Sequence, residues 1–101
     1  MKTVAVIDGQ GGKLGSMVVE AIRTEGLDCR IHAIGTNSIA TAAMLRAGAD
    51  AGATGENPVL VACRTADAPI GISQELQHVL YFRAGFHILL NCLNRLAEAQ
   101  P

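Results

Sequence analysis

Aromatic residues are scarce in this sequence, at 3% of the chain, although half of all residues are hydrophobic. Any core must therefore be built from Val, Ile, Leu and Ala, which suits a compact α/β packing. At 101 residues the chain is expected to form a single domain, residues 1–101. A domain of this size buries about 60–70% of its unfolded surface, which is enough for a modest core.

The chain also lacks an excess of charge of either sign. Eight Lys and Arg residues stand against nine Asp and Glu residues, and the formal net charge is −1. Without a basic stripe, the sequence has nothing to hold a phosphate backbone, so no nucleic acid partner is expected. A net charge near zero gives little protection against self-association.

Neither a disulfide framework nor a zinc site is indicated by the cysteines. Cys29, Cys63 and Cys92 are odd in number and far apart, so we interpret them as small buried hydrophobic residues in a reducing compartment. No segment approaches the ~20 apolar residues of a membrane span. The N-terminal apolar run ends at Asp8, which is too short for a signal peptide. The sequence therefore predicts a cytoplasmic protein with no membrane partner.

What the sequence does contain is an alternation of strand and helix patterns. Residues 3–7 are apolar or β-branched throughout, as in a parallel strand covered on both faces. Apolar residues at helical spacing follow, up to a glycine stop, and CRIHAIG at 29–35 predicts a second strand. Strand, glycine turn, helix and strand form a βαβ unit. A second helix is predicted over 38–47, with Asn37 or Ser38 as its N-cap.

The segment after this second helix has two interpretations. Residues 59–63 have the β-propensity of a third strand. However, Asn57 followed by Pro58 is also a helix start, with an N-cap and a proline at the first helical position. We favour a short strand at 51–54 and a helix at 58–65. In that case the polar turn between them lies at the same end of the sheet as the first glycine loop, and otherwise it lies at the opposite end.

From residue 73 onward the hydrophobic pattern predicts helices to the end of the chain. A leucine stripe at helical spacing packs into a core or forms a subunit interface, and here we expect a homodimer. The two stripes consist of Leu76, Val79 and Leu80, and then of Phe86, Leu89, Leu90, Leu93, Leu96 and Ala97.

Four glycines crowd into seven positions directly after the first predicted strand, in the stretch VAVIDGQGGKLG. The first amides of a helix lack internal partners and carry a positive partial charge, so a phosphate or carboxylate is favoured there. Glycines have no Cβ and let such an anion approach the backbone. Gly9, Gly11, Gly12 and Gly15 are thus typical of a dinucleotide-binding loop. A tight turn that serves only the fold is the alternative, and the P-loop pattern does not match.

Asp8, which directly precedes this loop, is an unusual neighbour for a phosphate, because its carboxylate repels an anion unless a cation or hydroxyl intervenes. It is expected to bind a ribose or an amine, to hold Mg²⁺, or to cap the turn through an Asx motif. With Glu56 it forms an acid/base or metal pair if their two loops meet. A solvated turn residue is the alternative for Glu56.

The second predicted strand is followed by Thr36 and Asn37, where NAD-binding sites commonly have an acidic residue that accepts the ribose hydroxyls. Both side chains can hydrogen-bond a ribose or tolerate a 2′-phosphate, but they do not select NAD, and no arginine follows to favour NADP. Capping of the next helix is the alternative role for Asn37. His32, His78 and His87 do not form a ligand-spaced set, and we interpret them as structural or surface residues.

Three motifs carry a resemblance to a known family: VIDGQGG in the first loop, IGTNSIATAAML with AGA in the second, and GATGEN in the third. Together they resemble a bacterial family of short proteins that is catalogued as a domain of unknown function and has a Rossmann-like, NAD(P)-binding appearance. The likeness covers residues 2–66 and Pro69-Ile70-Gly71. It implies that the loops at 8–12, 36–37 and 54–57 gather at one rim, and it brings no known reaction.

The C-terminal third departs from this family. There an apolar strand separates an Ala-Asp pair from a Pro-Ile-Gly turn, whereas here the pair Ala66-Asp67 runs almost directly into Pro69. The family's later helix and closing strand are not recognisable in residues 72–101.

Together these observations predict a Rossmann-like three-layer α/β domain with a short parallel sheet and a helical C-terminus. The expected ligand is a nucleotide, with NAD(P) or another nucleotide as cofactor, or a similar small anionic metabolite. Two alternatives stay open: a small oxidoreductase-like enzyme using Asp8 or Glu56, and a non-catalytic interaction module that dimerises through its leucine-rich C-terminal helices. The candidate binding residues are Asp8, Gly9, Gln10, Gly11, Gly12, Thr36, Asn37, Thr54, Glu56 and Asn57.

Overall fold

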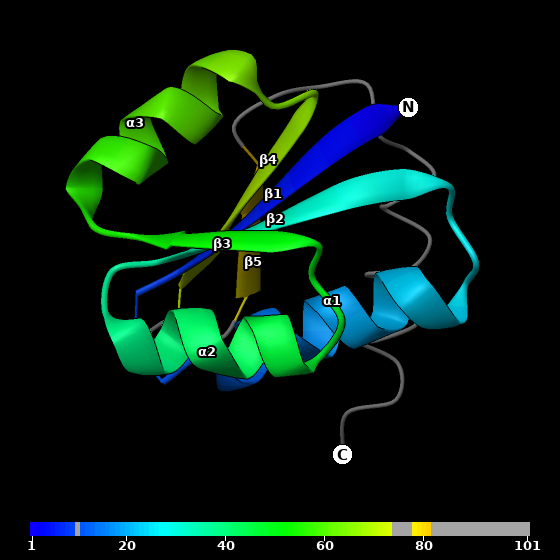
Figure 1. Ribbon diagram of the computed structural model, residues 1–101, viewed down its shortest axis with the longest axis horizontal. Helices are drawn as coiled ribbons and strands as arrows, with labels where there is room; N and C mark the ends of the chain where they lie inside the picture. The colour runs from blue at the N-terminus through cyan, green and yellow to red at the C-terminus, as the bar shows by residue number, and fades with distance from the viewer. Residues whose placement is uncertain (10, 74–77, 82–101) are drawn as a thin grey trace.

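Strands and helices alternate along the first two thirds of the chain in a computed structural model, which describes residues 1–9, 11–73 and 78–81 (Figure 1). The elements are β1 (Lys2–Asp8), α1 (Lys13–Thr24), β2 (Cys29–Gly35), α2 (Ser38–Arg46), β3 (Ala51–Thr54), α3 (Glu56–Thr65), β4 (Ala68–Ser73) and β5 (His78–Tyr81). The strands expected at 29–35 and 51–54 have the predicted bounds.

The strands form one sheet in the order β3-β2-β1-β4-β5. β1 pairs in parallel with both β2 and β4, and β2 pairs in parallel with β3, whereas β5 is antiparallel to β4. Helices α1 and α2 lie on one side of the strands and α3 lies on the other (Figure 1). The chain therefore has the expected Rossmann-like three-layer α/β fold, with four parallel strands.

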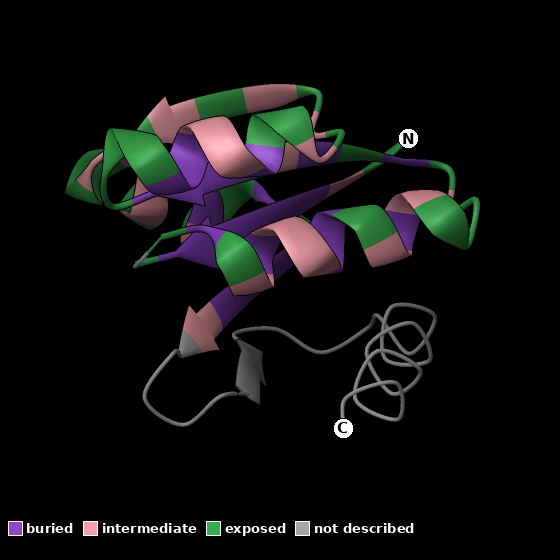
Figure 2. Cartoon of the chain, turned by 90° about the horizontal axis from the view of Figure 1, so that it is seen from below, coloured by how far each residue is buried: buried purple, intermediate pink, exposed green. Residues whose placement is uncertain are grey.

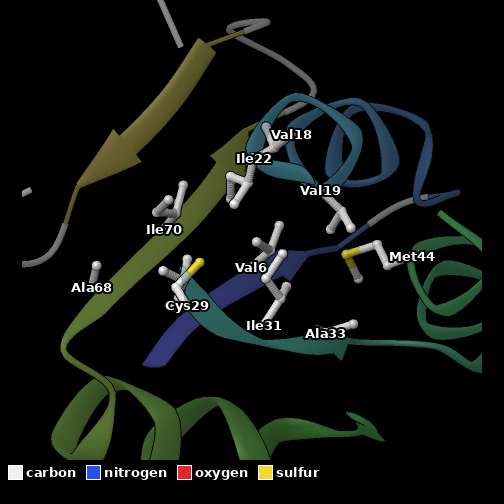
Figure 3. Packing of buried hydrophobic residues seen from close by; sticks show 11 residues of the cluster. Val6, Val18, Val19, Ile22, Cys29, Ile31, Ala33, Met44, Ala68 and Ile70 are labelled. Carbon is white, nitrogen blue, oxygen red and sulfur yellow. The ribbon is translucent and has the colours of Figure 1, made fainter. Parts of the chain in front are cut away.

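The larger core lies between the sheet and the helices α1 and α2. Val18, Val19 and Ile22 of α1 point onto Val6 of β1, and Met44 of α2 joins them from the side (Figure 3). The described members of this core are aliphatic or sulfur-containing residues, and the helical spacing on α1 directs its apolar side chains onto the sheet. The other members of this cluster are Val4, Cys29, Ile31, Ala33, Ala68 and Ile70.

A second, smaller core lies under α3 on the opposite face. Ala62 and Ala66 pack on Ala5, Ile7 and Ile34 from β1 and β2. Because successive residues of β1 point to opposite faces, Val4 and Val6 belong to the first core and Ala5 and Ile7 to the second. The central strands β1 and β2 are accordingly buried over most of their length, while the helices show exposed residues on their outer sides (Figure 2).

The third helix begins earlier than the sequence predicted. Residues 59–63 lie inside α3, so the alternative of a third strand there is wrong. The N-cap of α3 is Gly55, and its φ of 121° and ψ of 176° fall in a region that is essentially accessible only to glycine. The expectation that Asn57 caps this helix is therefore wrong, and Asn57 and Pro58 belong to its first turn.

The Pro-Ile-Gly segment, expected to form a turn, instead lies within strand β4. β4 pairs with β1 from Ala68 to Ile72, and Ile70 is fully buried. A proline cannot donate to a sheet ladder. Within the described register, β5 pairs with β4 only from Ile70 onward, so Pro69 is not required to donate to β5.

The helical prediction for the C-terminus is wrong where the structure describes it. Ser73 belongs to β4, and residues 78–81, which include Val79 and Leu80 of the first leucine stripe, form β5. The remaining stripe residues lie outside the described residues, so the expected dimerisation through them stays a prediction. Among the described helices, none is long and apolar enough to cross a membrane.

Candidate functional site

Three loops meet at the edge of the sheet where the parallel strands β1, β2 and β3 end. The amide of Thr36 donates to the carbonyl of Asp8 at 3.1 Å, and the Thr36 hydroxyl donates to the carbonyl of Gly9 at 3.0 Å. The amide of Gly55 donates to the carbonyl of Gly35 at 3.0 Å. The loop after β2 is therefore bonded to the loop after β1, and the loop after β3 is bonded to the last residue of β2, so the three loops lie at one edge as the resemblance implied. We call this edge the rim.

The four clustered glycines divide into two buried and two exposed positions. Gly12 has a φ of 83°, and a Cβ placed on it would lie 2.7 Å from the carbonyl oxygen of Ala40 in α2. A Cβ on Gly15 would lie 2.6 Å from the sulfur of Met44. These two glycines let α1 and α2 pack closely, so the interpretation of Gly12 as an open ligand contact is not supported.

Gly9 and Gly11 are exposed instead. A Cβ on Gly9 would make ordinary contact with the Thr36 side chain, at 3.6 Å from its hydroxyl oxygen, whereas a Cβ on Gly11 would meet nothing within 4 Å. Gln10 lies outside the described residues. Among the described residues of this loop, the accessible backbone is therefore that of Gly9 and Gly11.

Asp8 is fully buried, at 0% exposure, and its carboxylate faces the first turn of α1. Its Oδ2 atom accepts a hydrogen bond of 2.9 Å from the amide of Gly15, the third residue of the helix. The N-cap Gly12 has no side chain, so Asp8 supplies the side-chain acceptor that an N-cap residue normally provides. The sequence predicted that Asp8 could cap the turn, and this bond shows that Asp8 caps the first turn of α1 from the end of β1.

Asp8 and Glu56 do not form a pair. The Asp8 carboxylate is enclosed on the α1 and α2 side of the sheet, beside Gly15 and Met44. Glu56 is exposed in the first turn of α3, which packs on the other face. The acid/base or metal pairing considered from sequence therefore has no support in this geometry.

Asn37 caps α2. Its Oδ1 atom accepts a hydrogen bond of 2.9 Å from the amide of Ala40, which is one of the two roles expected for it. Thr36 and Asn37 are both exposed at the rim. Because the Thr36 proton is donated to Gly9, the Thr36 oxygen can serve a ligand as an acceptor.

A buried threonine that sequence reasoning missed holds the second and third loops together. The Thr41 hydroxyl lies 2.8 Å from the Thr54 hydroxyl and within hydrogen-bonding distance of the carbonyls of Asn37 and Ala53, at 3.2 and 3.3 Å. Gly35 makes room for it, since a Cβ there would clash with Thr41. Thr54, expected at the binding site, is therefore bonded to α2. Nothing in the sequence around Thr41 indicates this role, because a threonine within a predicted helix has no local feature that points to contacts with Ala53 and Thr54.

Metal ligands do not gather in the described part of the chain, where no group of three or more His, Cys, Asp or Glu residues could hold an ion. His32 is half-buried in β2, and its Nε2 atom accepts a hydrogen bond of 3.1 Å from Arg30. Cys29 is buried and Cys63 is partly buried, and neither forms a disulfide within the described residues. Their surroundings fit the structural roles expected from sequence.

A charged cluster lies at the opposite edge of the sheet. Asp50 accepts hydrogen bonds from the Ile31 amide at 2.7 Å and from the Arg23 guanidinium at 2.6 Å, and these two donors lower its pKa from the ordinary value of 3.8. Arg23 also donates to the carbonyls of Gly48 and Cys29. This cluster joins α1, β2 and the turn before β3, and it is separate from the rim.

Comparison with known proteins identifies one family to which this sequence is similar. No curated protein and no solved structure matches the chain. The sequence model of one family, the Domain of unknown function (DUF3842), matches residues 3–76, which include all of the elements from β2 to β4 and the three rim loops. The chain therefore belongs to this family.

Proposed function

We propose that this domain binds a nucleotide-class small molecule at the rim. In doubly wound α/β folds, ligands bind beyond the carboxyl ends of the parallel strands. The observation that carries the proposal is the exposed backbone of Gly9 and Gly11, held beside Thr36 by the Thr36–Gly9 hydrogen bond. A flat ring or sugar can approach the backbone at Gly11, because no described atom lies within 4 Å of the position that a Gly11 Cβ would take.

The first two amides of α1 add donors to this surface. Gly15 donates to Asp8 and Ser16 donates to the carbonyl of Gly12, whereas the Lys13 and Leu14 amides have no hydrogen-bond partner within the described residues. A helix N-terminus presents such amides to a ligand acceptor. In the proposal these amides and the Gly11 backbone contact one end of the ligand.

The other rim residues have roles that follow from their positions. The Thr36 oxygen accepts a hydrogen bond from a ribose hydroxyl, and Glu56 and Asn57, exposed on the first turn of α3, form the facing polar wall. NAD(P) and simpler nucleotides are the candidate ligands. Asp8 supports the loop from beneath and does not touch the ligand.

The test is calorimetric titration of the full chain with NADH, NADPH, ATP, AMP and adenosine. We expect saturable binding of at least one of them. Gly11→Val should weaken that binding at least tenfold, because its side chain enters open space and covers the loop backbone without disturbing the packing. Thr24→Val, at the far end of α1, is the matched control and should bind as the wild type does. Silence from all five compounds, in a sample shown to be folded, would contradict the proposal.

A further inference from the structure

The N-terminus of α1 already holds a negative group that belongs to the chain itself. A phosphate in a dinucleotide-binding fold sits against the first amides of this helix. Here the Gly15 amide is bonded to the Asp8 carboxylate at 2.9 Å. One of the donors that a phosphate requires is therefore taken by an internal anion.

The Asp8 carboxylate is held firmly in this position. It is fully buried. A Cβ placed on Gly15 would lie 2.6 Å from the Met44 sulfur and 3.0 Å from Asp8 Oδ2, so these groups are packed closely together. Met44 is itself 0% exposed. A carboxylate so enclosed cannot swing into solvent without opening the contact between α1 and α2, so it remains next to any group that binds the first turn.

A ligand phosphate on the Lys13 and Leu14 amides would therefore lie beside a buried negative charge. Repulsion between like charges is strong where water is excluded. Lys13 is exposed, so water and salt screen its charge and it offsets little of this repulsion. A hydroxyl or a carbonyl oxygen accepts from the same amides without the repulsion.

From this geometry we infer that the rim takes the nucleoside part of its ligand, with no phosphate on α1, and that Asp8 is the residue that determines this specificity. The inference rests on the proposed function and narrows its ligand class to uncharged or cationic nucleosides and to nucleotides whose phosphates point away from α1. Asp8 acts through charge at the helix terminus and does not contact the ligand.

The experiment compares adenosine, AMP and inorganic pyrophosphate by amide NMR titration of the full chain. In the wild type we expect adenosine to bind at least as tightly as AMP, and pyrophosphate to leave the amide signals of Lys13 and Leu14 unmoved. Asp8→Asn keeps the shape and an acceptor for Gly15 but removes the charge, so it should raise the affinity for AMP relative to adenosine about tenfold. Asp28→Asn makes the same charge change at an exposed position beyond the other end of α1 and should leave that ratio unchanged.

The possible results distinguish the inference about Asp8 from the proposed function. Wild-type AMP binding tenfold tighter than adenosine, with shifts at Lys13 and Leu14, would overturn the inference and leave the proposed function intact. If none of the five compounds named under the proposed function binds, the proposed function fails, and pyrophosphate still tests the charge argument. Saturable pyrophosphate shifts at Lys13 and Leu14 in the wild type would then overturn the inference, whereas shifts that emerge only in Asp8→Asn would support it. The wild-type titrations stand by themselves if Asp8→Asn does not fold.

Discussion

The Thr36 hydroxyl donates a hydrogen bond of 3.0 Å to the carbonyl of Gly9, although the two residues are 27 positions apart. They meet because β1 and β2 are parallel and in a register that places Asp8 beside Gly35. The loop after each strand then begins at the same height above the sheet. This contact fixes the glycine loop against the loop after β2 and gives the rim its shape.

Replacing Thr36 by Val should loosen this loop with little effect on the rest of the domain. The hydroxyl is exposed and water can replace part of the bond, so we expect a loss of up to ~1 kcal/mol in the free energy of unfolding. Amide hydrogen exchange at Gly9 and Gly11 should become faster. Thr24→Val, at an exposed helix end, is the control, and equal exchange rates in both variants would argue that the Thr36–Gly9 bond does not hold the loop.

Two asparagines at helix starts should respond differently to alanine substitution. Asn37 accepts from the Ala40 amide as the N-cap of α2, so Asn37→Ala should lower the free energy of unfolding by ~1 kcal/mol. Asn57 lies inside the first turn of α3, where Gly55 is the cap, so Asn57→Ala should change it by less than ~0.5 kcal/mol. Urea denaturation of both variants measures the difference. Equal losses would show that Asn57 also caps a helix.

Gly35 is required by the close approach of α2 to the end of β2. A Cβ there would lie 2.7 Å from the Asn37 carbonyl oxygen and from the Thr41 amide nitrogen, both backbone atoms that cannot move without shifting α2. We expect Gly35→Ala to cost about 3 kcal/mol in the free energy of unfolding. Gly11→Ala, with open space around the added methyl group, should stay within ~0.5 kcal/mol of the wild type. A tolerated Gly35→Ala would mean that α2 can withdraw from the sheet.

Asp50 should make the stability of the fold depend on pH in the acid range. The Ile31 amide and then the Arg23 guanidinium lower the pKa of Asp50 below its ordinary value of 3.8. A carboxyl group whose folded pKa is depressed contributes stability that is complete above its unfolded pKa. That contribution is lost as the pH falls from about the unfolded value through the folded one. Asp50→Asn should therefore be less stable than the wild type at pH 7 and should lose less stability on acidification.

Urea midpoints measured between pH 7 and pH 2 test this prediction. Asp28→Asn removes an exposed carboxylate outside the Arg23 cluster and is the control. If Asp50→Asn and the wild type lose stability in parallel as the pH falls, Asp50 does not contribute to the acid sensitivity.

The element pattern was readable from sequence because it depends on neighbours along the chain. The apolar run of β1, the strand at 29–35 and the cap at Asn37 each follow from residues within one element. The start of α3 was misplaced because Asn57-Pro58 is a good local helix start, yet the Gly55–Gly35 bond fixes the chain two residues earlier. The apolar alternation of Ala68, Ile70 and Ile72 was overlooked because Pro69 and Gly71 lie between them.

The sequence by itself determined the order of strands and helices from β1 to α3 and the parallel βαβ class of the fold, since periodicity and right-handed connection are local rules. The family resemblance implied that three loops gather at one rim. Only the tertiary structure decided what the loop residues do. Residues of α2 occupy the space that side chains at positions 12 and 15 would need, and the Asp8 carboxylate faces inward to the amide of Gly15. The direction in which a loop side chain points, and whether a loop position must be glycine, depend on which distant element packs against that position. For this loop that element is α2, about 25 residues further along the chain than Gly15.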